Sequence, residues 1–206
     1  VGIKVIGRGG HGSRPDMSVN PVFCAASILT NTATAWVNQI TAGRTVTLGV
    51  TSIQGGEAPN VIPDTADILG SLRFFNDEEG EKAVRIFKNV AEHTAAMNNC
   101  QVQFDDRFCV LCAPVINDEY YSNLISAALP EVLLENVTVS SCEPWYASES
   151  FSCYRRICPS VLAHLGINNP SYGSGAAHHN GFFDVDEGVL STGVIATLKF
   201  VAMLQK

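Results

Sequence analysis

The sequence lacks two features that define large classes of protein. Its 13 basic residues are outnumbered by 20 acidic ones, giving a net charge of −7, and they form no patch. Nucleic-acid backbones are bound through clustered Lys and Arg, so we expect no general affinity for nucleic acid. No apolar run approaches the roughly 20 residues that span a bilayer, so we expect no membrane helix. The apolar share of 46% indicates a globular chain with a real core.

A disulfide or zinc-finger framework is also missing. The seven cysteines are an odd number, which suits reduced thiols in a cytoplasmic setting. Cys109 and Cys112 form one close pair with Cys100 nearby, but a structural zinc site needs a second pair at matching spacing. We interpret these three thiols as buried or incidental, because free cysteine packs like a small hydrophobe. A thiol-metal site is the minor alternative.

The chain begins without methionine, inside what reads as a strand. Val1, Ile3 and Val5 alternate with Gly2 and Lys4, the period-two pattern of a strand. We therefore expect the chain to derive from a longer one, in which case a leader sequence would be lost and localisation is only weakly constrained.

Residues 1–112 alternate between strand and helix periodicity. After the opening strand and a glycine-rich loop, Asn20-Pro21 provides an N-cap and a proline at the first helical position. The β-α-β-β-α-β order predicts an α+β, ferredoxin-like domain, with one antiparallel sheet and two helices on one face. The expected elements are helices 21–37 and 77–98 and strands 46–50, 65–75 and 101–108. The apolar positions of the first helix are Val22, Ala25, Ala26, Leu29 and Ala33.

Residues 113–206 contain too few strands for an independent sheet. This half therefore reads as the α/β C-terminal remnant of a domain whose beginning is missing. The expected elements are helices 119–129, 151–156 and 186–204, short strands 137–141 and 160–165, and a loop at 166–183.

Four stretches, in order, carry a resemblance to a known family. They are GRGGHGSRP at 7–15, GG with NVIP and GSLR within 55–73, SESFS at 148–152 and HNGFFDVDE at 179–187. The chain resembles the zinc-dependent amidohydrolases of the aminoacylase/carboxypeptidase family, in the branch of hippurate hydrolases and plant auxin-conjugate hydrolases. The resemblance implies a lid (dimerisation) domain at 1–112 and a C-terminal segment of the catalytic domain at 113–206.

The resemblance also implies roles for individual residues. His11 and Asn60 would reach the active site of the partner subunit in a homodimer, where His11 stabilises the oxyanion of the tetrahedral intermediate. Arg73 would bind the substrate carboxylate, for which a guanidinium is suited. His179 would be a metal ligand, although the adjacent His178 would exchange with it on a one-residue shift. The metal would be zinc, with manganese, nickel or cobalt as alternatives.

Most of a binuclear metal site is not in this sequence. Such a site needs about five protein ligands and a carboxylate base. There is no Cys-x-His pair, and the one Glu-Glu pair, Glu78-Glu79, opens a helix of the lid. Ser150 stands where the family usually carries Asp, and Asn180-Gly181 where Ser-Pro is more common. We therefore expect the chain alone to be inactive.

Three hypotheses remain open from the sequence. The first is a fragment of an amidohydrolase that cleaves N-acyl amino acids or similar small amide conjugates. The second is a non-catalytic dimerisation or binding module of a diverged relative. The third is the thiol-metal protein, which alone predicts tight stoichiometric zinc binding by this chain.

Overall fold

The computed structural model describes residues 1–105, 112–133 and 137–205. The chain forms two compact units. The first is Val1–Pro114 with Tyr146–Ser150, and the second is Val115–Trp145 with Phe151–Lys206. The change of unit after Pro114 falls close to the expected boundary at residue 112, whereas nothing in the sequence pattern indicates the return segment Tyr146–Ser150.

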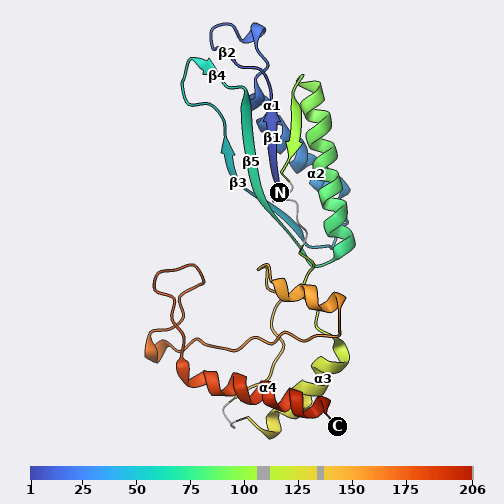
Figure 1. The fold of residues 1–206 in the computed structure, drawn as a ribbon, viewed down its shortest axis with the longest axis vertical. Helices are drawn as coiled ribbons and strands as arrows, with labels where there is room; N and C mark the ends of the chain where they lie inside the picture. The colour runs from blue at the N-terminus through green and yellow to red at the C-terminus, as the bar shows by residue number, and fades with distance from the viewer. Residues whose placement is uncertain (106–111, 134–136, 206) are drawn as a thin grey trace. The chain divides into compact units, whose positions relative to one another are not determined.

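A four-stranded antiparallel sheet forms the centre of the first unit (Figure 1). Two helices connect its strands, one from β1 to β3 and the other from β5 to β6, which confirms the predicted ferredoxin-like α+β arrangement. The strand order is β3-β5-β1-β6. The elements are β1 (Gly2–Ile6), α1 (Pro21–Gln39), β3 (Val46–Gln54), β5 (Thr65–Phe74), α2 (Asp77–Met97) and β6 (Gln101–Phe104).

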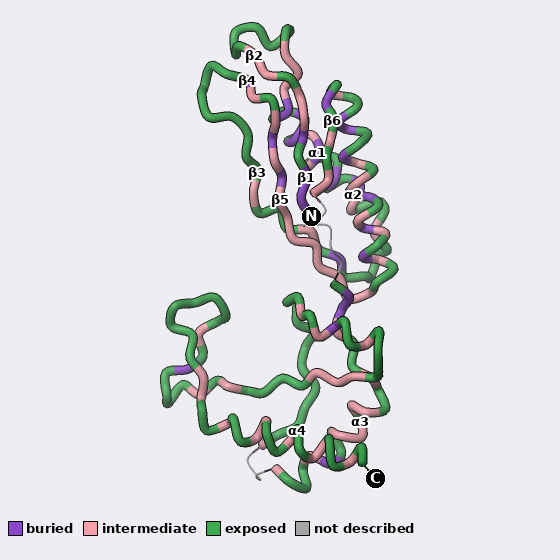
Figure 2. Tube along the Cα trace, viewed as in Figure 1, coloured by how far each residue is buried: buried purple, intermediate pink, exposed green. Residues whose placement is uncertain are grey.

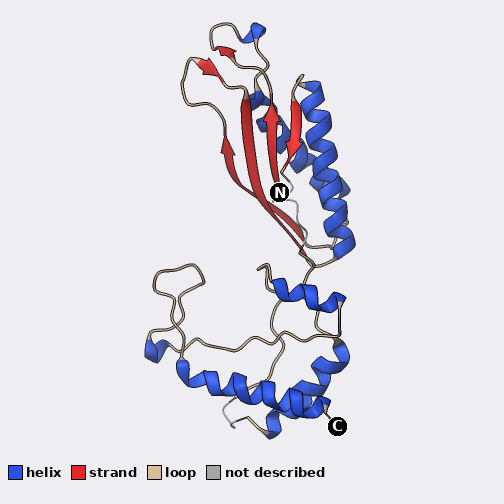
Figure 3. Cartoon of the chain, in the orientation of Figure 1, coloured by secondary structure: helices blue, strands red, loops and turns tan. Residues whose placement is uncertain are grey.

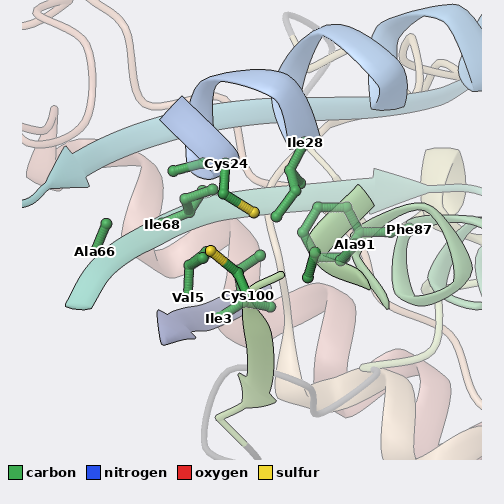
Figure 4. Packing of buried hydrophobic residues seen from close by; sticks show 11 residues of the cluster. Ile3, Val5, Cys24, Ile28, Ala66, Ile68, Phe87, Ala91 and Cys100 are labelled. Atoms are coloured by element: carbon green, nitrogen blue, oxygen red, sulfur yellow. The ribbon is translucent and has the colours of Figure 1, made fainter. Parts of the chain in front are cut away.

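The core lies between this sheet and the two helices. Ile3 and Val5 of β1 stand opposite Ile68 and Ala66 of β5, and all four are buried. Both helices pack on these side chains, so they cover the same face of the sheet (Figure 4). Burying one such side chain stabilises the fold by roughly 1.5–3 kcal/mol. The helices contribute Cys24, Ala25, Ile28, Phe87, Ala91 and Ala95.

Two thiols meet inside this core. Cys24 of α1 and Cys100, just before β6, are 0% and 5% exposed, and their sulfur atoms face one another in Figure 4. Burial, reinforced by the neighbouring thiol, raises the pKa of Cys24 to about 12. Burial also raises the pKa of Cys100. Cys100 is thus a buried thiol, as predicted, whereas Cys112 is exposed and Cys109 lies outside the described residues.

Helix α1 is confirmed, but its buried face differs from the expected apolar one. Val22, Ala26 and Ala33 are exposed. The aliphatic pattern was misleading because Cys24 and Thr32, which are not aliphatic, are buried. Asn31 in α1 also donates a 3.0 Å hydrogen bond to Thr94 of α2. The buried positions of α1 are Pro21, Cys24, Ala25, Ile28, Thr32 and Ala35.

A two-stranded ribbon extends from one end of the sheet. It is formed by β2 (Gly10–His11) and β4 (Val61–Ile62), within regions expected to be loops. Its base is fixed by Asp64, whose carbonyl accepts from the Gly7 N–H at 2.8 Å and whose carboxylate accepts from the Gly9 N–H at 2.7 Å. The ribbon brings together two loops that are about fifty residues apart in the sequence.

The second unit consists of helices and loops, with no strand among its described residues (Figure 3). Helix α3 (Glu119–Ala128) begins at Asp118, whose carboxylate accepts from the Tyr121 N–H at 3.0 Å. Helix α4 (Leu190–Leu204) follows a 3₁₀ turn at Glu187–Val189. The expected helix at 151–156 is a 3₁₀ helix, Ser150–Arg156.

The two short strands expected at 137–141 and 160–165 are wrong. Both segments are irregular. A strand is stable only beside a partner, and the described part of this unit offers none. In the second segment, the side chain of Asn117 takes the place of a partner strand at Leu162. Its Oδ1 accepts from the Leu162 N–H at 2.8 Å, and its Nδ2 donates to the Leu162 carbonyl at 3.0 Å.

Helix α4 leaves its apolar side chains open to solvent (Figure 2). Glu187–Leu204 meets the criteria of a membrane span by length and composition, with a mean hydropathy of 1.5. The expectation that no apolar run is long enough to span a bilayer is therefore wrong for this helix by these criteria, which core helices of soluble proteins also meet. Within the second unit, Lys199 of α4 bonds Glu131 at 2.8 Å, which ties the helix to the end of the α3 segment.

Candidate functional site

The ribbon brings His11 and Asn60 together. His11 pairs with Val61 across the ribbon, and the next residue, Gly12, donates its N–H to the Asn60 carbonyl at 2.8 Å. A Cβ atom on Gly12 would lie 3.2 Å from that oxygen, so glycine permits the close approach. His11 and Asn60 are both exposed, and nothing in the described first unit covers them. Two side chains that can donate hydrogen bonds are therefore presented from one rigid projection.

A cavity of about 370 Å³ adjoins the ribbon. Most of its lining residues lie in the loop between β3 and β4 and in β4, and Glu57 is the one ionisable residue among them. Gly56 takes a φ of +79° in this wall, a conformation that favours glycine. Cavities of this size accommodate small organic groups. The lining includes Gly12, Asn20, Glu57, Pro59, Val61 and Pro63.

The structure does not bring Arg73 to this site. β5 begins at Thr65, next to the ribbon, and Arg73 lies eight residues further along the strand, near its other end. There Arg73 pairs with Thr47 of β3. At about 3.4 Å per residue that separation is roughly 27 Å. The carboxylate-binding role of Arg73 thus stays a prediction separate from His11 and Asn60.

In the second unit, His178 and His179 have different environments. The His178 ring stacks on Phe183 with centroids 5.2 Å apart and lies 5.3 Å from the Trp145 ring. His179 is exposed and has a φ of +63°, which few residues other than glycine adopt. Such conformations concentrate at functional sites. His178 thus packs as an aromatic side chain, a role that sequence reasoning missed, but it is exposed like His179, so the metal-ligand role of His179 stays a prediction.

The described residues contain no group of three or more His, Cys, Asp or Glu side chains that could hold a metal ion. Ser150 only bonds the neighbouring Glu149, at 3.3 Å. Cys100 faces Cys24 in the core, so it does not form an open thiolate site with Cys112. His179 alone does not hold a metal tightly.

The first unit thus carries an exposed ribbon with His11 and Asn60 at the end of its sheet. Residues 1–98 match the family model described as the peptidase dimerisation domain. The match covers most of the first unit, which is therefore a peptidase dimerisation domain of the M20 type.

Relatives with known names cover nearly the whole chain. It is 28% identical to thermostable carboxypeptidase 2 of Saccharolobus solfataricus, over 94% of this chain and 48% of that protein. It is 25% identical to IAA-amino acid hydrolase ILR1-like 4 of Arabidopsis thaliana, over 92% and 43%. It is 28% identical to N-acetylcysteine deacetylase of Bacillus subtilis, over 92% and 47%. The chain spans about half the length of the curated relatives it matches.

Solved structures share the fold. A dinuclear metal binding peptidase from Bacillus subtilis aligns with a TM-score of 0.74 at 22% identity, over 98% of this chain and 49% of that one. The aminopeptidase PepT from Bacillus cereus aligns with a TM-score of 0.70 at 16% identity, over 98% and 51%.

Proposed function

We propose that this chain is the dimerisation domain and C-terminal catalytic segment of a metal-dependent amidohydrolase. The reaction is hydrolysis of the amide bond in N-acyl amino acids or similar small conjugates. The observation that carries the proposal is the ribbon that holds His11 beside Asn60 at the exposed end of a dimerisation domain. The relatives support the reaction class, since a carboxypeptidase, an amino acid hydrolase and a deacetylase all cleave amide bonds.

In this proposal the ribbon serves the active site of the partner subunit. His11 donates a hydrogen bond to the oxygen that becomes negative in the tetrahedral intermediate, as preorganised donors do. Asn60, held by Gly12, orients the substrate carbonyl. Arg73 binds a substrate carboxylate at a separate position of the dimer.

The homodimer would form through the free edge of β3 and the adjacent face of α1. β3 is an edge strand, with main-chain groups open to pairing. α1 runs beside it, because the Trp36 indole donates to the Val46 carbonyl at 3.2 Å and Val22 packs near Gly55. The exposed side of α1 carries Phe23 and Val37, which are 73% and 85% exposed. An edge strand beside an apolar helix face suits a self-complementary twofold interface.

The metal requires residues beyond those described. We propose zinc, with manganese, nickel or cobalt as alternatives, because mixed nitrogen and oxygen sites discriminate poorly by affinity. The metal supplies the activated water of hydrolysis. This chain would contribute His179, and a preceding segment would supply a Cys-x-His pair, a Glu-Glu pair and another His. The chain alone would then be inactive.

A cytoplasmic location is also proposed, on the sequence alone, because thiols in this number stay reduced there. Binding to nucleic acid or membrane is not part of the proposal.

The test uses the longest polypeptide encoded in frame with Val1–Lys206. We expect its upstream region to contain the missing ligands and the purified protein to hydrolyse N-acetyl and N-benzoyl amino acids. Chelation should abolish the activity and zinc should restore it. A polypeptide that dimerises but remains inactive with every metal would favour the second candidate, a non-catalytic binding module. The observation in favour of that candidate is Ser150, which stands where the family usually carries Asp.

A further inference from the structure

A turn folds Ser13 back over the His11 ring. The Arg14 N–H donates to the His11 carbonyl at 2.9 Å and closes the turn. Gly12, inside it, is held to the Asn60 carbonyl at 2.8 Å. In this geometry both the backbone N–H and the hydroxyl of Ser13 lie against His11 Nδ1, at 3.1 and 2.8 Å.

These two contacts determine which ring nitrogen carries the proton. A backbone N–H only donates, so Nδ1 must offer its lone pair. A proton on Nδ1 would point directly at the Ser13 N–H. The neutral ring therefore carries its hydrogen on Nε2, and the Ser13 hydroxyl also donates toward Nδ1. Nε2 is on the opposite side of the ring from the turn.

We propose that Ser13 is a positioning residue that holds His11 as the Nε2–H tautomer and aims that N–H away from the ribbon. Ser13 acts through His11 and does not touch substrate. The catalytic consequence rests on the proposed function, because only an Nε2–H in this orientation gives a neutral donor to the oxyanion. The tautomer itself is independent of that function.

The same domain contains a reference with the opposite arrangement. His93 of α2 has its Nδ1 2.7 Å from the Asn89 carbonyl. A carbonyl only accepts, so His93 must carry its proton on Nδ1. One spectrum of the folded chain should therefore contain both neutral tautomers, each assigned in advance to one residue.

The experiment is long-range ¹H–¹⁵N correlation NMR on the 206-residue chain labelled with ¹⁵N-histidine, which has only five histidines. The spectrum is recorded at about pH 8.5, above the ordinary titration range of imidazole. His11→Ala and His93→Ala assign the signals. We expect His11 as Nε2–H and His93 as Nδ1–H. Ser13→Ala keeps the backbone N–H contact but loses the shorter hydroxyl contact, so it should move His11 alone part of the way toward a tautomer mixture, and Ser13→Thr should restore it. The unchanged His93 pattern reports that each variant is folded.

Two results would overturn the proposal: a wild-type His11 with its proton on Nδ1, or a Ser13→Ala variant whose His11 pattern equals that of the wild type. Activity separates this proposal from the proposed function. In an active full-length polypeptide, Ser13→Ala should lower kcat about tenfold with little change in KM, and Ser13→Thr should recover it. An inactive wild-type polypeptide with the expected tautomers would reject the function and leave the positioning role intact.

Discussion

The Gly12 N–H donates to the Asn60 carbonyl at 2.8 Å, which joins two loops that are distant in the sequence into one projection. His11 precedes Gly12 directly, so the bond holds the histidine and the asparagine next to each other in the ribbon. A projection of this kind suits a group that acts outside its own subunit. This relationship leads to the first of four predictions.

Complementation between subunits tests whether His11 works in the partner's site. In the full-length polypeptide, His11→Ala should lower kcat about 10²–10³-fold, the loss typical of an oxyanion donor. His179→Ala should remove metal-dependent activity. Mixing the two variants should restore about one quarter of wild-type activity, because half of randomly mixed dimers are hybrids and each hybrid has one complete site. No recovery on mixing would place His11 in the site of its own subunit.

The base of the ribbon depends on a glycine without room for a side chain. A Cβ atom on Gly7 would lie 2.2 Å from the Val19 carbonyl. Gly7→Ala should therefore reduce the free energy of unfolding by about 2 kcal/mol, measured by urea denaturation of the chain. Gly49→Ala is the matched control, because a Cβ atom at that position would have no atom within 4 Å. Equal stability of the two variants would contradict the packing described for the ribbon.

The buried Cys24 thiol should make stability depend on alkaline pH. Its folded-state pKa is about 12, against an ordinary 9.0. Below pH 9 the thiol keeps its proton in both the folded and the unfolded state, so its contribution to the free energy of unfolding is fully present. Between pH 9 and 12 the unfolded state ionises first, so unfolding releases a proton and stability falls as the pH rises.

The measurement compares urea midpoints of the wild type and Cys24→Ala at pH 7 and at about pH 10.5, the latter inside the window where the two states differ. The variant lacks this proton release, so the wild-type advantage should shrink at the higher pH. Titrating groups other than Cys24 and its neighbour Cys100 are common to both proteins and cancel. A constant difference between the two proteins across this range would show that the Cys24 thiol is not protected from ionisation.

The proposed dimer face can be tested with two residues of equal exposure. Phe23 on α1 and Met97 at the end of α2 are both 73% exposed. Phe23→Glu should convert a dimeric chain to monomer, since a charge in the centre of an apolar interface stays unpaired. Met97→Glu should leave the mass unchanged. Sedimentation equilibrium distinguishes the outcomes, and a Phe23→Glu protein that stays dimeric would move the interface elsewhere.

Much of the first unit is readable from local pattern. Alternation in β1, the Asn20 cap and the acidic start of α2 each depend on neighbours in the sequence, so strands and helices are predicted well. The buried face of α1 was misjudged because Cys24 and Thr32, which are not aliphatic, are buried in the folded unit. The expected strand at 160–165 failed for the related reason that a strand needs a partner.

For the candidate site too, the sequence identified residues, whereas their contacts were visible only in the structure. Motif resemblance selected His11, Asn60 and His179, and the Ser two residues after His11 was a visible sign of a side chain able to bond back to the ring. The pairing that brings His11 to Asn60 spans about fifty residues and is not visible in local pattern. Nor is the stacking of the His178 ring on Phe183 and near Trp145.

By itself, the sequence determined the order of the main strands and helices of the first unit, the resemblance to a family and the residues able to do chemistry, because periodicity, caps and motifs are local properties of a chain. Only the tertiary structure decided which of those residues meet. It set Arg73 apart from the ribbon, paired Cys24 with Cys100 and turned Ser13 onto His11. Whether two residues that are distant in the sequence lie close together depends on strand register and side-chain packing. Local sequence patterns are compatible with several registers, and only the folded structure selects one of them.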